Sequence, residues 1–163
     1  MRREHISCGF SVVELMVALA IVAILAGLAT PALTTWKLNH QLYGAAANLA
    51  ADLELAKMRA IRENSFVAVV FTAGGYTIFV DNGAGGGDPG DWVRSGEESL
   101  VQQRDFPPGV QILMDDLTLA DSRVRFNGRG FPMDVLATAT IPVTNPRGTR
   151  QVTLSRVGNV RVN

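Results

Sequence analysis

The chain has 163 residues and a mass of 17.5 kDa, which suffices for one compact domain with an appendage but not for two full domains. Its 15 Lys and Arg residues balance 15 Asp and Glu residues, so net charge does not indicate nucleic acid or a membrane surface as a partner. The single cysteine, Cys8, excludes an internal disulfide and a cysteine-based zinc site, and two histidines are too few for a histidine-rich metal centre. With 47% apolar and 18% charged residues, the composition argues against a disordered chain, and no cofactor is expected.

The chain begins with a short basic segment and continues into a long apolar one. Arg2 and Arg3 precede residues 10–29, which read FSVVELMVALAIVAILAGLA. As a helix, this run is about 30 Å long, which matches the hydrocarbon core of a bilayer. The positive-inside rule places the N-terminus in the cytoplasm and the rest of the chain outside. A secretory signal cut near Ala26-Gly27-Leu28-Ala29 is the alternative, whereas a lipoprotein is excluded because Cys8 lies before the apolar run.

One carboxylate interrupts this apolar segment. At the bilayer centre, the Glu14 side chain would cost about 2.5–3.5 kcal/mol, so a function and a partner are expected for it. No Lys or Arg lies between Phe10 and Trp36, so a cation from another chain is the natural partner. If the chain is cut after Gly9, the new amino group of Phe10 would supply that cation.

Residues 8–15, which read CGFSVVEL, resemble the type IV prepilin signature: a short basic leader that ends in Gly, then Phe, with Glu five positions after the cut. Pro31 also falls where these proteins usually carry a helix-bending proline. The resemblance implies cleavage between Gly9 and Phe10 by a prepilin peptidase and N-methylation of Phe10. It further implies assembly into a filament in which Glu14 pairs with a neighbour's N-terminus.

The helical pattern resumes after Pro31 and predicts a helix from about Phe10 to about Arg62. Its expected apolar stripe consists of Leu38, Leu42, Ala45 or Ala46, Leu49, Leu53, Ala56 and Ala60, while Asn48, Asp52, Lys57, Arg59, Arg62 and Glu63 are expected mostly off that stripe. Seven strands are expected after the helix: 65–72, 76–80, 109–114, 124–127, 136–143, 151–155 and 160–162. One long helix followed by such strands predicts an α+β protein whose antiparallel sheet packs on the outer half of the helix.

Two head segments narrow the resemblance. Residues 56–64, AKMRAIREN, and residues 124–130, VRFNGRG, together with a closing Arg/Gly strand pair, are similar to the GspH/FimT branch of pilin-like proteins. This branch contains minor pseudopilins of type II secretion and minor pilins of type IV pili. It implies a non-enzymatic subunit of the inner membrane, with other pilins, a prepilin peptidase and an inner-membrane assembly platform as partners. The expected organisation is a cleaved leader (1–9), a transmembrane and filament-core helix (10–30), its amphipathic continuation (31–64) and a β-rich periplasmic head (65–163).

An acidic, glycine-rich loop at residues 81–92 offers three carboxylates, Asp81, Asp88 and Asp91. Calcium takes six to eight oxygen ligands, so these three are candidate calcium ligands. Their spacing does not match the EF-hand pattern, and no glutamate closes the loop. A solvated hairpin loop is therefore favoured over a metal site.

Charge is segregated along the head. Residues 81–121 hold nine acids and two arginines, whereas residues 123–163 hold seven arginines and one acid. The favoured interpretation is that these segments neutralise each other or dock neighbouring subunits. A DNA-binding face for DNA uptake is the alternative, because arginines engage phosphates; its candidate contacts are Arg147, Arg150, Arg156 and Arg161. DNA-uptake members of the resembling group end in Gly-Arg-x-Arg, from which Gly158-Asn159-Val160-Arg161 departs at Asn159.

Overall fold

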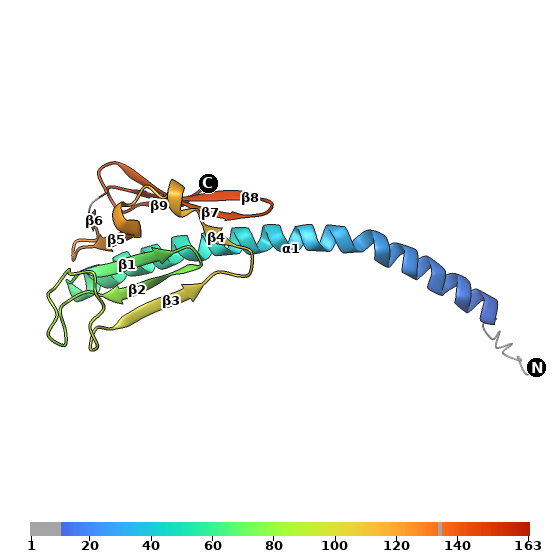
Figure 1. Ribbon diagram of the computed structural model, residues 1–163, viewed down its shortest axis with the longest axis horizontal. Coiled ribbons are helices and arrows are strands. Elements are labelled where there is room, and N and C mark those ends of the chain that lie inside the picture. The colour runs from blue at the N-terminus through green and yellow to red at the C-terminus, as the bar shows by residue number, and fades with distance from the viewer. Residues whose placement is uncertain (1–10, 134) are drawn as a thin grey trace, which may run out of the picture. The chain divides into compact units, whose positions relative to one another are not determined.

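A computed structural model describes residues 11–133 and 135–163 (Figure 1). The chain divides into an N-terminal unit that ends at Lys37 and a compact unit, Leu38–Asn163. A single α-helix, α1 (Val12–Glu63), contributes to both units. From here on, the compact unit, which includes the second half of α1 as well as the strands, is called the head.

In the N-terminal unit, the apolar side chains of α1 are exposed. None of the most apolar 18-residue window is buried, and by length and composition this part of α1 can cross a membrane. The helix continues through residue 31, although proline has no N–H to donate there. The kink expected at Pro31 therefore stays a prediction. The expected cleavage site at Gly9 and Phe10 lies outside the described residues.

The strands of the head form two antiparallel sheets (Figure 1). The five-stranded sheet has the order β3-β2-β1-β5-β6 and consists of β1 (Val67–Thr72), β2 (Gly75–Val80), β3 (Leu100–Asp105), β5 (Arg123–Phe126) and β6 (Pro132–Met133). The four-stranded sheet has the order β4-β7-β8-β9 and consists of β4 (Gln111–Ile112), β7 (Thr138–Asn145), β8 (Gly148–Ser155) and β9 (Val160–Val162). Two short 3₁₀ helices, η1 (Met114–Asp116) and η2 (Ala120–Ser122), lie between β4 and β5.

The predicted α+β fold, one long helix with antiparallel strands, is confirmed. Each of the seven expected strands occurs, although β4 is shorter than residues 109–114 and β7 begins and ends later than residues 136–143. Strands β3 and β6 were not predicted. The sequence of β3, LVQQRD, lacks alternating apolar residues, and β6 has only two residues, one of them proline. The strands also divide between two sheets, where the sequence predicted one.

The core lies between α1 and both sheets. The predicted stripe is buried from Leu42 to Ala60, and residues of both sheets join it in one apolar cluster. Leu38, at the start of the stripe, is half-buried. One expectation is wrong: Asp52, placed off the stripe, is buried. Its spacing from Leu49 and Ala56, three and four residues, puts it on the same helix face as these apolar residues.

Candidate functional site

The first turn of α1 carries the predicted assembly residue, Glu14. The Ser11 hydroxyl accepts a hydrogen bond from the Val13 amide at 3.3 Å, and the Ser11 carbonyl accepts one from the Leu15 amide at 3.1 Å, so Ser11 caps the helix. Glu14 is the third residue of this helix, and Ser-x-x-Glu is the capping-box pattern. The positive N-terminal end of the helix dipole also stabilises a carboxylate at this position. Glu14 is exposed, and its sequence position would let it stabilise the helix start in addition to the role expected in assembly.

A buried polar cluster joins α1 to the five-stranded sheet. The Tyr76 hydroxyl of β2 donates to Asp52 Oδ2 at 2.6 Å, and Arg104 Nε of β3 donates to the same oxygen at 2.8 Å. Burial raises the pKa of the Tyr76 hydroxyl above its ordinary value, and the hydrogen bond to Asp52 raises it further. Sequence reasoning missed this cluster, although the place of Asp52 on the apolar stripe was the signal that it needed buried partners.

Two further hydrogen bonds hold α1 against other parts of the head. Asn145 Nδ2, at the end of β7, donates to the Leu38 carbonyl at 2.8 Å. Lys57 Nζ donates at 2.8 Å to the carbonyl of Gly158, in the turn between β8 and β9. Gly158 has φ of +79°, and a Cβ there would lie 2.7 Å from the Gly130 carbonyl oxygen. This turn therefore requires glycine for packing against α1 and the β5–β6 turn.

Buried carboxylates organise the acidic loop after β2. Asp81 accepts hydrogen bonds from the amides of Gly90 and Trp92 at 2.9 and 3.2 Å. Burial raises the pKa of the Asp81 carboxyl, and these two N–H groups lower it in part. Glu98 likewise accepts from the backbone amides of Gly83 and Ser95, both at 2.9 Å. Both carboxylates are buried and hold the loop backbone.

The three calcium candidates do not form a ligand set. Both Asp81 oxygens accept hydrogen bonds from the backbone amides of Gly90 and Trp92, and Asp91 Oδ1 accepts one from the Val93 amide at 2.8 Å. Within residues 11–133 and 135–163, no group of three or more His, Cys, Asp or Glu side chains is placed to hold a metal ion. Asp81 is therefore a structural residue that holds the backbone of the loop.

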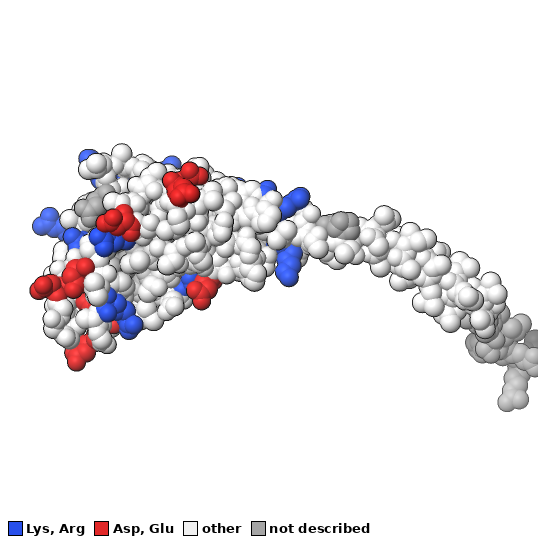
Figure 2. Space-filling model, in the orientation of Figure 1, with Lys and Arg blue, Asp and Glu red and all other residues white. Residues whose placement is uncertain are grey.

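The acidic and basic segments of the head meet at Trp92. The guanidinium carbons of Arg123 and Arg125, both on β5, lie 4.6 and 4.8 Å from the centre of the Trp92 ring. Arg125 Nη1 also donates to the Gly90 carbonyl, and Arg123 pairs with Asp121 at 2.8 Å. Contact between the two segments was one of the outcomes expected from the sequence, and it occurs here. Figure 2 shows acidic and basic side chains interspersed over this face of the head rather than one field of a single sign.

The four arginines proposed for DNA binding are exposed but do not share one surface. Arg161 of β9 pairs in register with Thr153 of β8, on the face opposite the buried Val152 and Leu154. Arg150 has the same parity as Val152 along β8, and its guanidinium lies 5.8 Å from the ring centre of Tyr43 on α1. The structure therefore separates Arg150 from Arg161. Arg147 lies in the turn between β7 and β8, and Arg156 follows the end of β8.

Arg161 borders a small polar hollow on the outer face of the four-stranded sheet. The hollow has a volume of about 210 Å³ and is lined by Thr138, Thr153, Ser155, Asn159 and Arg161. Each of these side chains can donate a hydrogen bond, and none is acidic. The hollow is therefore suited to an anionic group.

Comparison with known proteins agrees with this architecture. The family description "Type II transport protein GspH" matches residues 45–158, and "Prokaryotic N-terminal methylation motif" matches residues 6–30. The pilin-like protein PilA1 of Thermus thermophilus is 35% identical over 161 residues, covering 94% of this chain and 97% of PilA1.

Solved structures show the same fold. The type IV minor pilin FimU of Pseudomonas aeruginosa is 15% identical with a TM-score of 0.58, over 77% of this chain and 90% of FimU. The minor pseudopilin EpsH from the type 2 secretion system of Vibrio cholerae is 17% identical with a TM-score of 0.55, over 76% of this chain and 96% of EpsH. The match to the GspH description covers more than half of the chain. The chain therefore belongs to the GspH family of pilin-like structural subunits, the minor pilins and pseudopilins of type IV pili and type II secretion.

Proposed function

We propose that the chain is processed and assembled as a minor subunit of a type IV pilus or a type II secretion pseudopilus. A prepilin peptidase would cut between Gly9 and Phe10, and Phe10 would be N-methylated. The observation that carries this proposal is the N-terminal half of α1, an apolar helix that no other residue in the described part of the chain covers. The methylation motif over residues 6–30 supports it independently.

An uncovered apolar helix needs an apolar surrounding. Between Val12 and Trp36, large apolar side chains are 53% to 75% exposed, far more contiguous apolar surface than a soluble monomer carries. Before assembly, the inner membrane would cover this surface, with the N-terminus in the cytoplasm and the head in the periplasm. After extraction by the assembly platform, the helices of neighbouring pilins would cover it.

Glu14 would select the register of assembly. In an apolar bundle, an unpaired carboxylate is costly, and pairing with the Phe10 amine of an adjacent subunit removes that cost. Subunits in other registers would leave both charges unpaired. Glu14 would thus favour one axial offset between neighbours.

The test of processing is the intact mass of the full-length protein, extracted from membranes of cells with and without the prepilin peptidase. With the peptidase, we expect loss of residues 1–9 and the addition of one methyl group. Without it, we expect the full-length mass. A full-length mass in both strains, or a cut near Ala29, would contradict the proposal and leave an anchored or secreted head.

A second candidate function is DNA binding, in the sense of a DNA-uptake subunit. The polar hollow beside Arg161 favours it, because a space of about 210 Å³ lined by hydroxyl, amide and guanidinium groups, with no acid, suits a phosphate group. This candidate rests on Arg161 and its surroundings, since Arg150 lies on the other face of β8.

DNA binding is tested with the full chain in detergent and duplex DNA at several salt concentrations. We expect Arg161→Ala to weaken binding and to reduce the slope of log K against log salt by about one. Arg150→Ala is the matched control and should leave that slope unchanged. An affinity that Arg161→Ala does not alter would eliminate this candidate.

A further inference from the structure

The last two turns of α1 carry a second apolar stripe, separate from the one buried against the sheets. Leu55, Met58 and Ile61 are 44%, 64% and 45% exposed, whereas Leu53, Ala56 and Ala60 are fully buried. A helix that is apolar on two sides is expected to be covered on both. In the described part of the chain, only one of these sides is covered.

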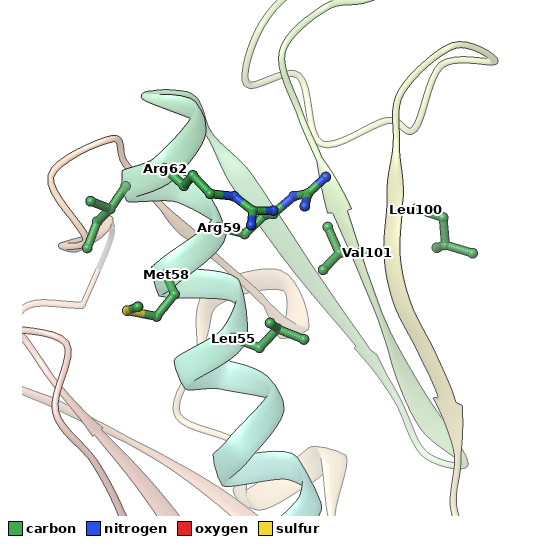
Figure 3. Close-up of a pocket in the computed structure, with 7 residues that line it drawn as sticks. Leu55, Met58, Arg59, Arg62, Leu100 and Val101 are labelled. Atoms are coloured by element: carbon green, nitrogen blue, oxygen red, sulfur yellow. The ribbon is translucent and has the colours of Figure 1, made fainter.

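Leu55, at one edge of this stripe, faces an open groove between α1 and β3, whereas Met58 points away from β3 (Figure 3). Val101 of β3, the edge strand of the five-stranded sheet, faces Leu55, while Leu100 points away from the helix, and the groove has a volume of about 520 Å³. In Figure 3, Leu55 and Val101 lie between the helix and the strand. The groove thus combines an apolar floor with a strand edge that no other described strand pairs with.

Two arginines extend over the groove. Figure 3 shows the side chains of Arg59 and Arg62 running from α1 toward β3. Arg59 Nε lies 2.6 Å from Glu63 Oε1, so Arg59 is already paired. Arg62 is exposed and forms none of the ion pairs found among the described residues. The occupant that complements this surface offers an apolar side chain together with a carboxylate for Arg62.

We propose that the groove between α1 and β3 docks the head of an adjacent filament subunit, which inserts an apolar side chain over Leu55 and Val101 and pairs a carboxylate with Arg62. This inference rests on the proposed function, since it requires a filament. It adds a contact between heads to the contact between helices through Glu14. A contact of this kind is heterologous: one face of a subunit meets a different face of the next, which generates an open helical array.

Charge complementarity and shape favour a protein occupant over a small molecule. Small-molecule sites bury most of their ligand, whereas the side chains of this groove are about half exposed. The head itself carries the required carboxylates: Asp115 and Asp116 of η1 are exposed neighbours and form none of the ion pairs found among the described residues, while Met114 and Leu117 beside them pack against the core. A pilin-like head can therefore present such a carboxylate.

The first test reverses the charge of Arg62 in the full-length chain, in cells that assemble the filament. For Arg62→Glu we expect normal processing and membrane level, but about a tenfold lower amount in the sheared filament fraction, because a like-charge contact opposes docking. Arg147→Glu, a reversal of another exposed arginine far from the groove in sequence, is the matched control and should remain within about twofold of wild type. Equal incorporation of both variants would overturn the inference.

The second test maps the occupant directly. Leu55 is 44% exposed and lies between α1 and β3 in Figure 3, so Leu55→p-benzoylphenylalanine places a photo-crosslinker in the groove with little effect on folding. We expect a crosslink to an acidic segment in the head of a second copy or of a related pilin in the filament fraction. The same probe at the exposed Val157 is the control and should not give this product. A crosslink within the same chain, to a protein that is not a filament subunit, or no crosslink would each overturn the inference.

The two proposals fail in different ways. If the wild-type chain is absent from every filament fraction, the proposed function is wrong and the groove contact falls with it. If the wild-type chain is present, but Arg62→Glu is incorporated equally and the probe at Leu55 gives no head-to-head crosslink, only the groove contact is wrong.

Discussion

The two halves of α1 both present leucines on their surface but differ in what covers those leucines. In the N-terminal half, leucines such as Leu19 and Leu25 are 59% and 60% exposed, whereas Leu49 and Leu53 in the head are fully buried. Both halves belong to one continuous helix. The difference lies in the two sheets, which supply a core to the second half of α1 and contribute none of their residues to the first half. In the proposed function, the head stabilises itself, whereas a membrane or neighbouring helices would cover the N-terminal half.

The largest expected effect concerns Glu14, the one charged residue of the N-terminal half before Lys37 in the described chain. Glu14→Ala should insert into the membrane but reach the filament fraction at about a tenth of the wild-type level or less, since the Phe10 amine of the neighbour would lack its partner. The measurement is immunoblotting of membrane and sheared filament fractions.

Glu14→Gln separates assembly from helix capping. Glutamine serves at the third position of a capping box as glutamate does, but it carries no charge. We expect Glu14→Gln to be as defective as Glu14→Ala, and Ser11→Ala, which removes only the capping hydroxyl, to assemble. If Glu14→Gln assembles normally, the role of Glu14 is helix capping rather than pairing with a neighbour.

Core substitutions in the two halves should sharpen the comparison further. Leu49→Ala removes a fully buried side chain and should lower the free energy of unfolding of the head by about 2–5 kcal/mol. Leu19→Ala in the N-terminal half and Leu55→Ala in the groove wall should change it by about 0.5 kcal/mol or less, because both side chains are exposed. Urea unfolding of the full chain in detergent, followed by far-UV circular dichroism, provides the measurement. A comparable loss for Leu19→Ala would mean that both halves unfold as one cooperative unit.

The sequence predicted the parts that depend on local pattern. The apolar run predicted the exposed half of α1, and spacings of three and four predicted its buried stripe, because helix periodicity places such residues on one face. Strand β3 escaped prediction, since an edge strand that reads LVQQRD is recognised by its pairing with β2 rather than by its own residues. The cluster of Asp52, Tyr76 and Arg104 escaped for a similar reason: the three residues lie far apart in the chain, and only the tertiary fold brings them together. The groove required the structure too, because the second stripe is apparent only once the first is known to be covered.

A smaller effect on the free energy of unfolding is expected when the polar cluster of Asp52, Tyr76 and Arg104, which joins α1 to the five-stranded sheet, loses one hydrogen bond. Tyr76→Phe removes the donor 2.6 Å from Asp52 and should cost about 1–3 kcal/mol in the free energy of unfolding. In the folded head, the pKa of Tyr76 is raised above its ordinary value of 10.0, so its protonated form is stabilised by folding. This stabilisation is complete below pH 10 and is lost as the pH rises further. The difference between wild type and Tyr76→Phe should therefore shrink above pH 10, as urea titrations at several pH values would test; a difference independent of pH would contradict this assignment.

The smallest effect belongs to Asp81 in the acidic loop. Burial raises its pKa above the ordinary value of 3.8, so its contribution to stability is complete below that pH and declines as the pH rises toward the folded pKa. Asp81→Asn has no titration and replaces one of the two carboxyl oxygens that accept from the amides of Gly90 and Trp92 with an NH₂ group, which cannot accept. The variant should be less stable than wild type at pH 3.5, by about 1–3 kcal/mol for the lost acceptor. This difference in stability should narrow as the pH rises above the ordinary pKa of the carboxyl, because ionisation of Asp81 is disfavoured in the folded head. Leu19→Ala, measured in parallel, should show no such change with pH, because the N-terminal half carries no part of this loop. A difference that widens as the pH rises would mean that the hydrogen bonds from Gly90 and Trp92 outweigh the burial of Asp81.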